Sequence, residues 1–292
     1  MTQAKKRLEE QVCNASKKNP KSFWKYVRNS LKSKSGVSPL LRSPADKTSV
    51  RFSNEDKADI LQDQFCSVFT KEPRGQLPDF PSRTDSSIEI QLTIEMVKKE
   101  IHSLNPNKSF GPDEIHPMMV KELVDYISIP LYIIMKKSLI EGLLPEEWKV
   151  ANVTPIYKKG SKNIAENYRP VSLTSIACRI MEKIIKTQIM THLTKENLLS
   201  KKQHGFMTKR STVTQLLSYL DKCAESISKN NVVDVIYFDF AKAFDTVPHK
   251  RLLKKLEAYG IRGQVLKWIE AFISNRYQLV KVNGISSKKC KV

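Results

Sequence analysis

The sequence has little of what marks secreted, zinc-binding or membrane proteins. Its five cysteines stand far apart, without a C-x-x-C pair or a histidine at metal-ligand spacing, so neither a zinc site nor a disulfide framework is expected. The longest uninterrupted apolar stretch, Ile129 to Met135, is much shorter than a membrane span, and the lysine-rich start lacks the apolar core of a signal peptide. We therefore expect a soluble protein of a reducing intracellular compartment, nuclear or cytoplasmic, with no membrane partner.

Acidic residues are scarce relative to basic ones. The 292 residues include 50 Lys and Arg against 30 Asp and Glu, which gives a formal net charge of +20. Such a charge attracts polyanions, so a phosphate-rich partner is the first interpretation. A basic protein without such a partner is the alternative that charge alone leaves open. With 40% hydrophobic residues, the chain can bury one sizeable core or two smaller ones.

Residues 1–90 are predicted to be a basic linker with short helices. Residues 1–40 hold ten Lys and Arg and two Glu, a local charge of 10 − 2 = +8. Prolines punctuate the stretch that follows. One short helix is expected around Lys57 to Phe69, where apolar residues recur at helical spacing.

Residues 91–292 show stronger patterning, which predicts an α+β fold. Apolar residues three and four apart indicate several helices. These helices are expected at 94–104, after a Thr93 cap and before Pro106; at 119–139; at 177–193; after Pro248, closed by Gly260; and at 265–272. Val150 to Tyr157 is predicted to be a strand, in which Pro155 favours an edge position or a bulge. The β-branched and aromatic run Val232 to Phe240 is predicted to be a buried strand.

Asp239 is the sharpest local feature, because it places an acid at the end of an apolar strand. Burying a carboxylate there costs several kcal/mol unless a cation, a metal or hydrogen bonds compensate it. A metal-ligand role is one interpretation, and a strand-end Asp that accepts backbone N–H bonds is the other. Asp245 and Thr246 precede Pro248, where we expect Asp245 to cap the next helix.

Three further segments carry positive charge beside glycine. "YKKGSKNIAENYRP" offers Lys158, Lys159 and Arg169 as phosphate ligands, or it is a solvated basic turn. "QHGFMTKRST" sets Lys209 and Arg210 near Gly205. These residues could contact a phosphate chain, or the segment could simply cap a helix through Ser211 or Thr212. "NKSFGPDEIHP" holds Lys108 and a Gly-Pro turn that could be only a loop.

Taken in order, these segments resemble the early blocks of the reverse transcriptases of non-LTR (LINE-type) retrotransposons. "NKSFGPDEIHP" is similar to the "KSPGPDGI" block, and the stretch from "LPEEWKVANV" to "YRPVSL" is similar to the first finger block. "QHGFMTKRST" is similar to the "QxGFRxGxST" block, with Met207 in place of the usual Arg, and "VIYFDFAKAFDTVPHK" is similar to the first palm motif. The resemblance covers about 93–283 and is nearest to the jockey-like group.

The resemblance implies a right-hand polymerase with fingers at 91–230 and the start of the palm at 231–292. It implies that Asp239 and the carbonyl of Phe240 hold Mg²⁺ in a two-metal site, and that Phe244 forms a wall under the sugar that excludes a 2′-hydroxyl. The implied roles of the other residues follow. Lys158, Lys159 and Arg169 hold the triphosphate, and Lys108, Gly205, Lys209 and Arg210 contact nucleic acid. The implied partners are an RNA template, a DNA primer or target and deoxynucleoside triphosphates; oligomeric state stays open.

The second catalytic motif of that family, "YxDD", does not occur in the sequence, nor does any Asp-Asp pair. One carboxylate cannot hold two magnesium ions, so we expect this chain to be incomplete and inactive as a polymerase by itself. The alternative function is a non-catalytic, basic nucleic-acid-binding remnant of a truncated element. A metal-dependent hydrolase built on "DFAKAFD" would need more acidic or histidine ligands than the neighbourhood offers.

Overall fold

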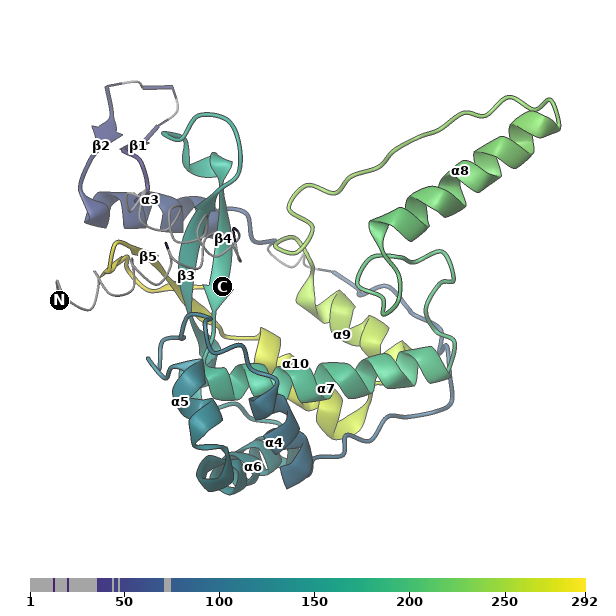
Figure 1. The fold of residues 1–292 in the computed structure, drawn as a ribbon, viewed down its shortest axis with the longest axis horizontal. Helices are drawn as coiled ribbons and strands as arrows, with labels where there is room; N and C mark the ends of the chain where they lie inside the picture. The colour runs from purple at the N-terminus through teal and green to yellow at the C-terminus, as the bar shows by residue number, and fades with distance from the viewer. Residues whose placement is uncertain (1–12, 14–19, 21–35, 44, 47, 71–74) are drawn as a thin grey trace.

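The computed structural model describes Cys13, Pro20, and residues 36–43, 45–46, 48–70 and 75–292. Helices and a small mixed sheet lie side by side, with the sheet and α3 at one end and the packed helices at the other (Figure 1). The α+β prediction is thereby confirmed. Most of the basic segment 1–40 lies outside the described residues.

The secondary-structure elements follow the predicted order closely. In the described part of the chain the helices are α3 (Asn54–Cys66), α4 (Ile94–His102), α5 (Pro117–Glu122), α6 (Val124–Glu141), η1 (Glu146–Lys149), η2 (Ala165–Asn167), α7 (Ile176–Lys195), α8 (Thr212–Ser228), α9 (His249–Ala258) and α10 (Gly263–Ile273). The strands are β1 (Leu40–Leu41), β2 (Val50–Arg51), β3 (Val150–Tyr157), β4 (Tyr168–Leu173), β5 (Tyr277–Val282), β6 (Ile285–Ser286) and β7 (Cys290–Lys291).

The main sheet has the order β4-β3-β5-β6, and β7 also pairs with β5. β3 runs antiparallel to β4 and parallel to β5. The strand predicted at 150–157 is confirmed, and so is the edge position expected at Pro155, because β5 does not extend along that part of β3. β5 pairs only with 150–153 of β3. Pro155 therefore lies where β3 has β4 as its one neighbour, and the missing N–H is tolerated there.

Two hydrophobic cores hold the fold together. The larger lies among the helices α4 to α7 and α10 and includes Met135, Ile180 and Trp268. The smaller lies between the sheet and the segment before it, where Leu61 and Phe65 of α3 pack with sheet residues. Part of the stretch predicted as linker therefore covers one face of the sheet, because the apolar side of α3 has a partner there.

Two predicted helix ends, the start of α4 at Thr93 and the end of α9 at Gly260, agree with the structure. Thr93 Oγ1 accepts a hydrogen bond from Met96 N, 3.2 Å away, at the start of α4. Gly260 follows α9 with φ +81°, a left-handed conformation that glycine adopts without strain. The helix predicted at 119–139 is instead two helices, because the backbone leaves the helical region at Leu123 (φ −96°, ψ 18°).

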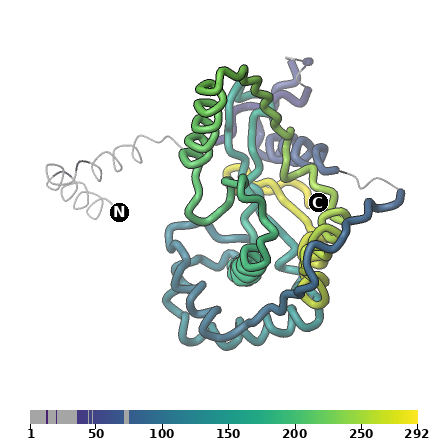
Figure 2. Tube along the Cα trace, turned by 90° about the vertical axis from the view of Figure 1, so that its right-hand side faces the viewer, coloured from purple at the N-terminus to yellow at the C-terminus, as the bar shows by residue number. Residues whose placement is uncertain are grey.

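The prediction of a buried strand at 232–240 is wrong. The segment is extended but forms no strand, and Val232, Phe238 and Phe240 are 90%, 88% and 83% exposed. Figure 1 shows α8 standing away from the packed helices, and Figure 2 shows the chain descending from its end to α9. Strand-forming residues need a neighbouring strand to satisfy their backbone, and the described residues bring none to this segment. Asp239 is exposed for the same reason.

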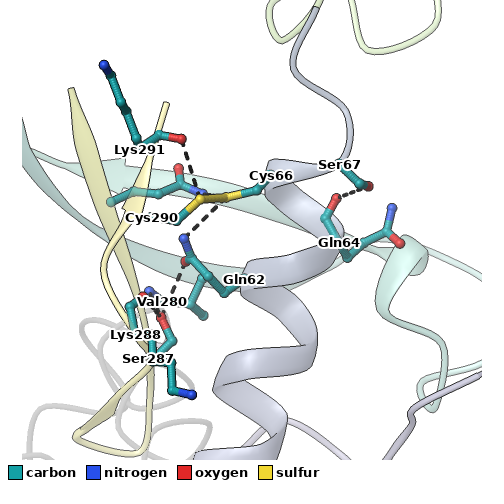
Figure 3. Close-up of a disulfide and its surroundings, with 10 residues drawn as sticks. Gln62, Gln64, Cys66, Ser67, Val280, Ser287, Lys288, Cys290 and Lys291 are labelled. Atoms are coloured by element: carbon teal, nitrogen blue, oxygen red, sulfur yellow. Dashed lines mark hydrogen bonds between the residues drawn. A yellow bond between two sulfur atoms is a disulfide. The ribbon is translucent and has the colours of Figure 1, made fainter. Parts of the chain in front are cut away.

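The expectation of no disulfide is also wrong. Cys66 at the end of α3 and Cys290 in β7 form a disulfide across a sequence separation of 224 (Figure 3). Gln62 Nε2 donates to Cys66 Sγ at 3.3 Å. Spacing could not reveal this pair, because only the packing of α3 on the sheet brings the two sulfurs together. Among the described residues, no helix is long and apolar enough to cross a membrane.

Candidate functional site

Five of the predicted site residues meet around one cavity of about 720 Å³, here called the Asp239 cavity. They come from the turn after β3, from β4 and from the turn before α9. These five are Lys158, Arg169, Asp239, Phe240 and Phe244. Gln64 and Phe65 in the last turn of α3 and Val68 just after it also line the wall. The cavity thus brings together cations, acids and aromatic rings from segments far apart in the sequence. The cations are Lys158, Arg169 and Lys242, and the acids are Glu166, Asp239 and Asp245.

The cationic side of the cavity is held by a hydrogen-bonded turn between β3 and β4. Lys158 N donates to Asn167 O at 2.8 Å, and Asn167 Nδ2 donates to Ser161 O at 2.8 Å. Gly160 adopts φ +86°, and a Cβ there would lie 2.7 Å from Asn167 Nδ2. The turn therefore requires glycine. Lys158 lines the Asp239 cavity, whereas Lys159 does not.

The opposite side is a tight turn that contains Phe244. The backbone N–H groups of Asp245 and Thr246 both donate to the carbonyl of Lys242, at 2.9 and 3.2 Å. The ring of Phe206 meets the ring of Phe244 edge to face, with centroids 6.1 Å apart. Phe206 was not among the predicted site residues, although it lies within the "QHGFMTKRST" segment. Its aromatic ring beside Phe244 could have been found only from the three-dimensional contact.

The helix-capping role predicted for Asp245 is wrong. α9 begins after Pro248, and no described side chain caps its N-terminus. Asp245 instead lines the Asp239 cavity, and burial raises the pKa of its carboxyl while the charge of Lys242 partly offsets that shift.

The residues predicted to contact nucleic acid lie elsewhere. Arg210 donates from Nη1 to the carbonyls of Lys201 and Gln203, so its guanidinium holds its own loop together. The carbonyl of Gly205 accepts a hydrogen bond from Gln203 Nε2 at 3.0 Å, and Lys209 adopts φ +61°. These residues lie in the loop that leads into α8.

Lys108 lies apart from that loop. It lines a smaller cavity of about 330 Å³, together with Phe110 and Lys281. None of the four residues predicted to contact nucleic acid, Lys108, Gly205, Lys209 and Arg210, lines the Asp239 cavity.

The "GPD" part of the first segment has a structural role that the sequence did not reveal. Gly111 is buried, and a Cβ there would lie 2.3 Å from the backbone oxygen of Thr174. Asp113 Oδ2 accepts a hydrogen bond from Ile176 N at 3.3 Å, at the start of α7. The segment therefore fixes the N-terminus of α7 against the end of β4.

The oxygen ligands available for a metal ion are few. Carboxylate and carbonyl oxygens such as those of Asp239 and Phe240 are the donors that Mg²⁺ prefers. However, no group of three or more His, Cys, Asp or Glu side chains in the described part of the chain could hold a metal ion. The residues present thus do not make a complete two-metal site, and we derive no step through one.

The Asp239 cavity places cations, acids and aromatic rings together within an α+β fold. Residues 156–292 match the family model described as reverse transcriptase (RNA-dependent DNA polymerase). The chain is similar to the RNA-directed DNA polymerase from mobile element jockey of Drosophila funebris, with 26% identity over 274 residues. That alignment covers 91% of this chain and 30% of the relative.

Two further relatives agree with this match. The probable RNA-directed DNA polymerase from transposon BS of Drosophila melanogaster is 24% identical, over 90% of this chain and 30% of its own length. A Pol polyprotein from the type-1 retrotransposable element R2 of Popillia japonica is 26% identical, over 52% of this chain and 21% of its own length. These findings support a reverse transcriptase of the non-LTR, LINE type, and the chain spans about 30% of the length of the first relatives.

Proposed function

We propose that the Asp239 cavity is the nucleotide-binding part of an RNA-directed DNA polymerase domain, and that it takes a deoxynucleoside triphosphate. The observation that carries the proposal is the convergence of Lys158, Arg169, Asp239, Phe240 and Phe244 on one cavity. In this proposal residues 91–230 form the fingers, and residues 231–292 form the first part of the palm. Residues 1–90 are the segment that precedes the domain.

In this proposal the basic residues bind the triphosphate and Phe244 contacts the sugar. Lys158 supplies a point charge and Arg169 a planar fork, which together suit the oxygens of a triphosphate. Lys159 is one residue away on the same turn and can join them when a nucleotide is bound. Phe244 sets a bulky ring where a 2′-hydroxyl would lie, so it selects the sugar by shape.

Asp239 and the Phe240 carbonyl would contribute oxygen ligands to a divalent cation, and reverse transcriptases generally use divalent metal ions. When bound, Mg²⁺ supplies charge neutralisation at the phosphates. A full two-metal site needs carboxylates beyond those that the described residues bring together. We therefore expect the 292-residue chain to bind nucleotide without extending a primer.

The template and primer are the remaining partners in this proposal. Lys108, Gly205, Lys209 and Arg210 are the proposed contacts to the RNA template and the DNA strand, and the net charge of +20 supports a polyanionic partner. Arg210 would act by shaping the loop before α8, since its Nη1 is already bonded to two backbone carbonyls.

Nucleotide binding by the purified chain tests the proposal. A fluorescent dATP analogue with Mg²⁺ should bind the wild type, and Lys158→Gln or Arg169→Gln should weaken binding roughly tenfold, the cost of one charge-assisted contact. Lys186→Gln is the matched control, because Lys186 is an exposed lysine on α7 outside the Asp239 cavity. Equal affinity in all four proteins would refute the assignment of this cavity.

Primer extension on an RNA template tests the expected inactivity. Extension by the chain alone that disappears in Asp239→Ala would show that the chain carries a complete active site. In contrast, a second candidate function, binding of nucleic acid without nucleotide, is favoured by the small number of metal ligands in the described part of the chain. It predicts RNA affinity that falls steeply with salt, together with no measurable dATP binding.

A further inference from the structure

Helix α6 lies at the outer end of the packed helices, on the side away from the sheet (Figure 1). One side of this helix, with Met135 and Leu139, is buried in the larger core. The other side is exposed and is here called the α6 face. Its residues are Tyr126, Ile129, Ile133, Lys137 and Ile140. The helix is thus apolar on both sides, a pattern that is typical of a helix buried all round.

The side chains of the α6 face follow one stripe along the helix. They recur at spacings of three and four residues, which keeps them on the same side of an α-helix. The four apolar members are each more than half exposed: Tyr126 at 80%, Ile129 at 51%, Ile133 at 58% and Ile140 at 55%. Met119 in α5, seven residues before Tyr126, is 56% exposed. A contiguous exposed apolar stripe of this kind marks an interaction surface.

Opposite charges stand at the two ends of the α6 face. Glu122, the last residue of α5, is exposed just before α6, and Lys137 is exposed near the C-terminus of α6. Asp125 is already paired with Lys98 at 2.8 Å, whereas Glu122 makes no ion pair within the described part of the chain. Lys137 has an exposed ion pair with Glu141 at 3.8 Å, a kind of pair that contributes little to stability. An antiparallel copy of α6 would set the acidic end against the basic end, whereas a parallel copy would set like charges together.

The α6 face is also complementary to itself in the order of its residues. Two identical helices related by a twofold axis pair antiparallel, and each facing pair then occurs twice. One register places this axis between Ile129 and Pro130. The facing pairs in this register are Ile129 with Pro130, Tyr126 with Ile133, Met119 with Ile140, and Glu122 with Lys137. A single register therefore gives apolar residues apolar partners and sets the acid against the base.

We propose that the α6 face binds a second copy of this chain through antiparallel pairing of the two α6 helices. A second copy is the occupant because the face matches itself in both charge and apolar positions. The contact is independent of the proposed function, since no residue of α5 or α6 lines the Asp239 cavity. The 18 residues of α6 extend about 27 Å at 1.5 Å per residue, so the interface is small and the dimer is weak and reversible.

Sedimentation equilibrium of the nuclease-treated 292-residue chain measures this contact. High salt is used first, because it suppresses association bridged by residual nucleic acid. The wild type should show a reversible monomer–dimer equilibrium. Ile133→Lys should weaken dimerisation roughly tenfold or more, since it places an unpaired charge in the centre of an apolar interface. Leu217→Lys is the matched control, because Leu217 is 61% exposed on α8, and it should leave dimerisation unchanged.

Charge exchange tests the register at low salt, where ion pairs are least screened. Glu122→Lys and Lys137→Glu should each weaken dimerisation several-fold, because each sets like charges opposite one another on both sides of the axis. The double variant exchanges the two charges, restores both ion pairs and should recover most of the wild-type dimerisation. Loss of fold cannot produce such a recovery, and parallel pairing does not predict it. A double variant that dimerises no better than the single variants would overturn the proposed register.

Two results of the high-salt experiment would overturn the dimer itself. A wild type that stays monomeric up to roughly 100 μM would show that the α6 face does not bind a second copy and would leave it to a different partner. Dimerisation that is lost in Leu217→Lys and kept in Ile133→Lys would assign self-association to the exposed apolar side of α8. Loss in Ile133→Lys alone, with recovery in the charge-exchanged double variant, supports the proposal.

Discussion

Phe206 and Phe244 meet edge to face, with their ring centroids 6.1 Å apart. This contact links the loop before α8 to the turn before α9, two segments that the sequence singled out for different reasons. Phe244 is 81% exposed and Phe206 is 88% exposed, so each ring is the other's aromatic support. The loop before α8, which is proposed to contact the template, thereby also supports Phe244, the ring proposed to exclude a 2′-hydroxyl.

Sugar discrimination is the measurable consequence of this pair. Phe244→Ala should raise the affinity for ATP relative to dATP roughly tenfold, because an excluded 2′-hydroxyl regains its space. Phe206→Ala should act in the same direction with a smaller effect, since it removes only the support. Phe238→Ala is the control, because Phe238 is 88% exposed and does not line the cavity. An unchanged ratio in Phe244→Ala would contradict the assignment of its ring.

The buried hydrogen bond from Trp268 Nε1 to Ser138 Oγ, 3.1 Å long, ties α10 to α6. Ser138→Ala leaves the indole N–H buried without an acceptor, so the free energy of unfolding should fall by about 1–3 kcal/mol. Ser128→Ala is the matched control, because the Ser128 hydroxyl donates only to the carbonyl of Val124 one turn earlier in the same helix. Urea unfolding of the two variants measures the difference, and equal losses would show that the Trp268 contact contributes nothing.

Gly111 is predicted to be the least replaceable glycine of the finger segment. A Cβ at this position meets the backbone of Thr174 and Ser175 rather than a movable side chain. Gly111→Ala should therefore lower the free energy of unfolding by about 2–4 kcal/mol through displacement of the start of α7. Gly205→Ala, where the nearest atom is 3.8 Å away, serves as the control in the same thermal melts. A small effect at Gly111 would show that the loop can move away from α7.

Local signals explain which parts of this fold could be predicted. The Thr93 cap and the Gly260 terminator act within one helical turn, and the strand 150–157 has its partner β4 within reach of a short turn. The segment 232–240 has the residues of a strand, yet strand formation depends on a neighbour that sequence patterning does not supply. Propensity alone therefore predicted the wrong burial for Asp239.

In the candidate site, too, residues in short local motifs could be predicted, whereas residues brought together only by long-range packing could not. Lys158 and Arg169 were singled out because they lie in a short basic segment beside a glycine, and Phe244 was singled out through the resemblance to the first palm motif. Arg179 and Arg276 were not found, because each is a single basic residue in a helix or before a strand, where it is indistinguishable from a solvated charge. Only the three-dimensional fold places both on the wall of one cavity, which shares Phe244 with the Asp239 cavity.

Thiol counting checks the disulfide and the buried cysteine together. Of five cysteines, Cys66 and Cys290 are paired, which leaves 5 − 2 = 3 free thiols. Burial raises the pKa of Cys178 to about 12, so it should react with a thiol reagent at mildly alkaline pH only after unfolding. We expect slow reaction at Cys178 in the folded protein, three thiols after denaturation and five after reduction. Five thiols in the unreduced, denatured protein would contradict the pairing.

Glu182 should make stability depend on pH in the direction opposite to an ion-paired carboxylate. Because the pKa of Glu182 in the folded protein lies above its ordinary value of 4.5, the folded state binds its proton more tightly than the unfolded state. Its contribution to stability is therefore fully present below pH 4.5 and is lost as the pH rises from 4.5 through the raised pKa. Glu182→Gln does not ionise, so it avoids this loss.

The melting temperature of Glu182→Gln should match that of the wild type at the acid end of this window and exceed it increasingly as the pH rises, with a plateau above the raised pKa. Glu89→Gln, at an exposed position, should show no such divergence. A variant that is less stable than the wild type at neutral pH would mean that the charges of Arg179 and Arg276 outweigh burial at Glu182. In that case Glu182 would serve those arginines as a fixed counter-charge.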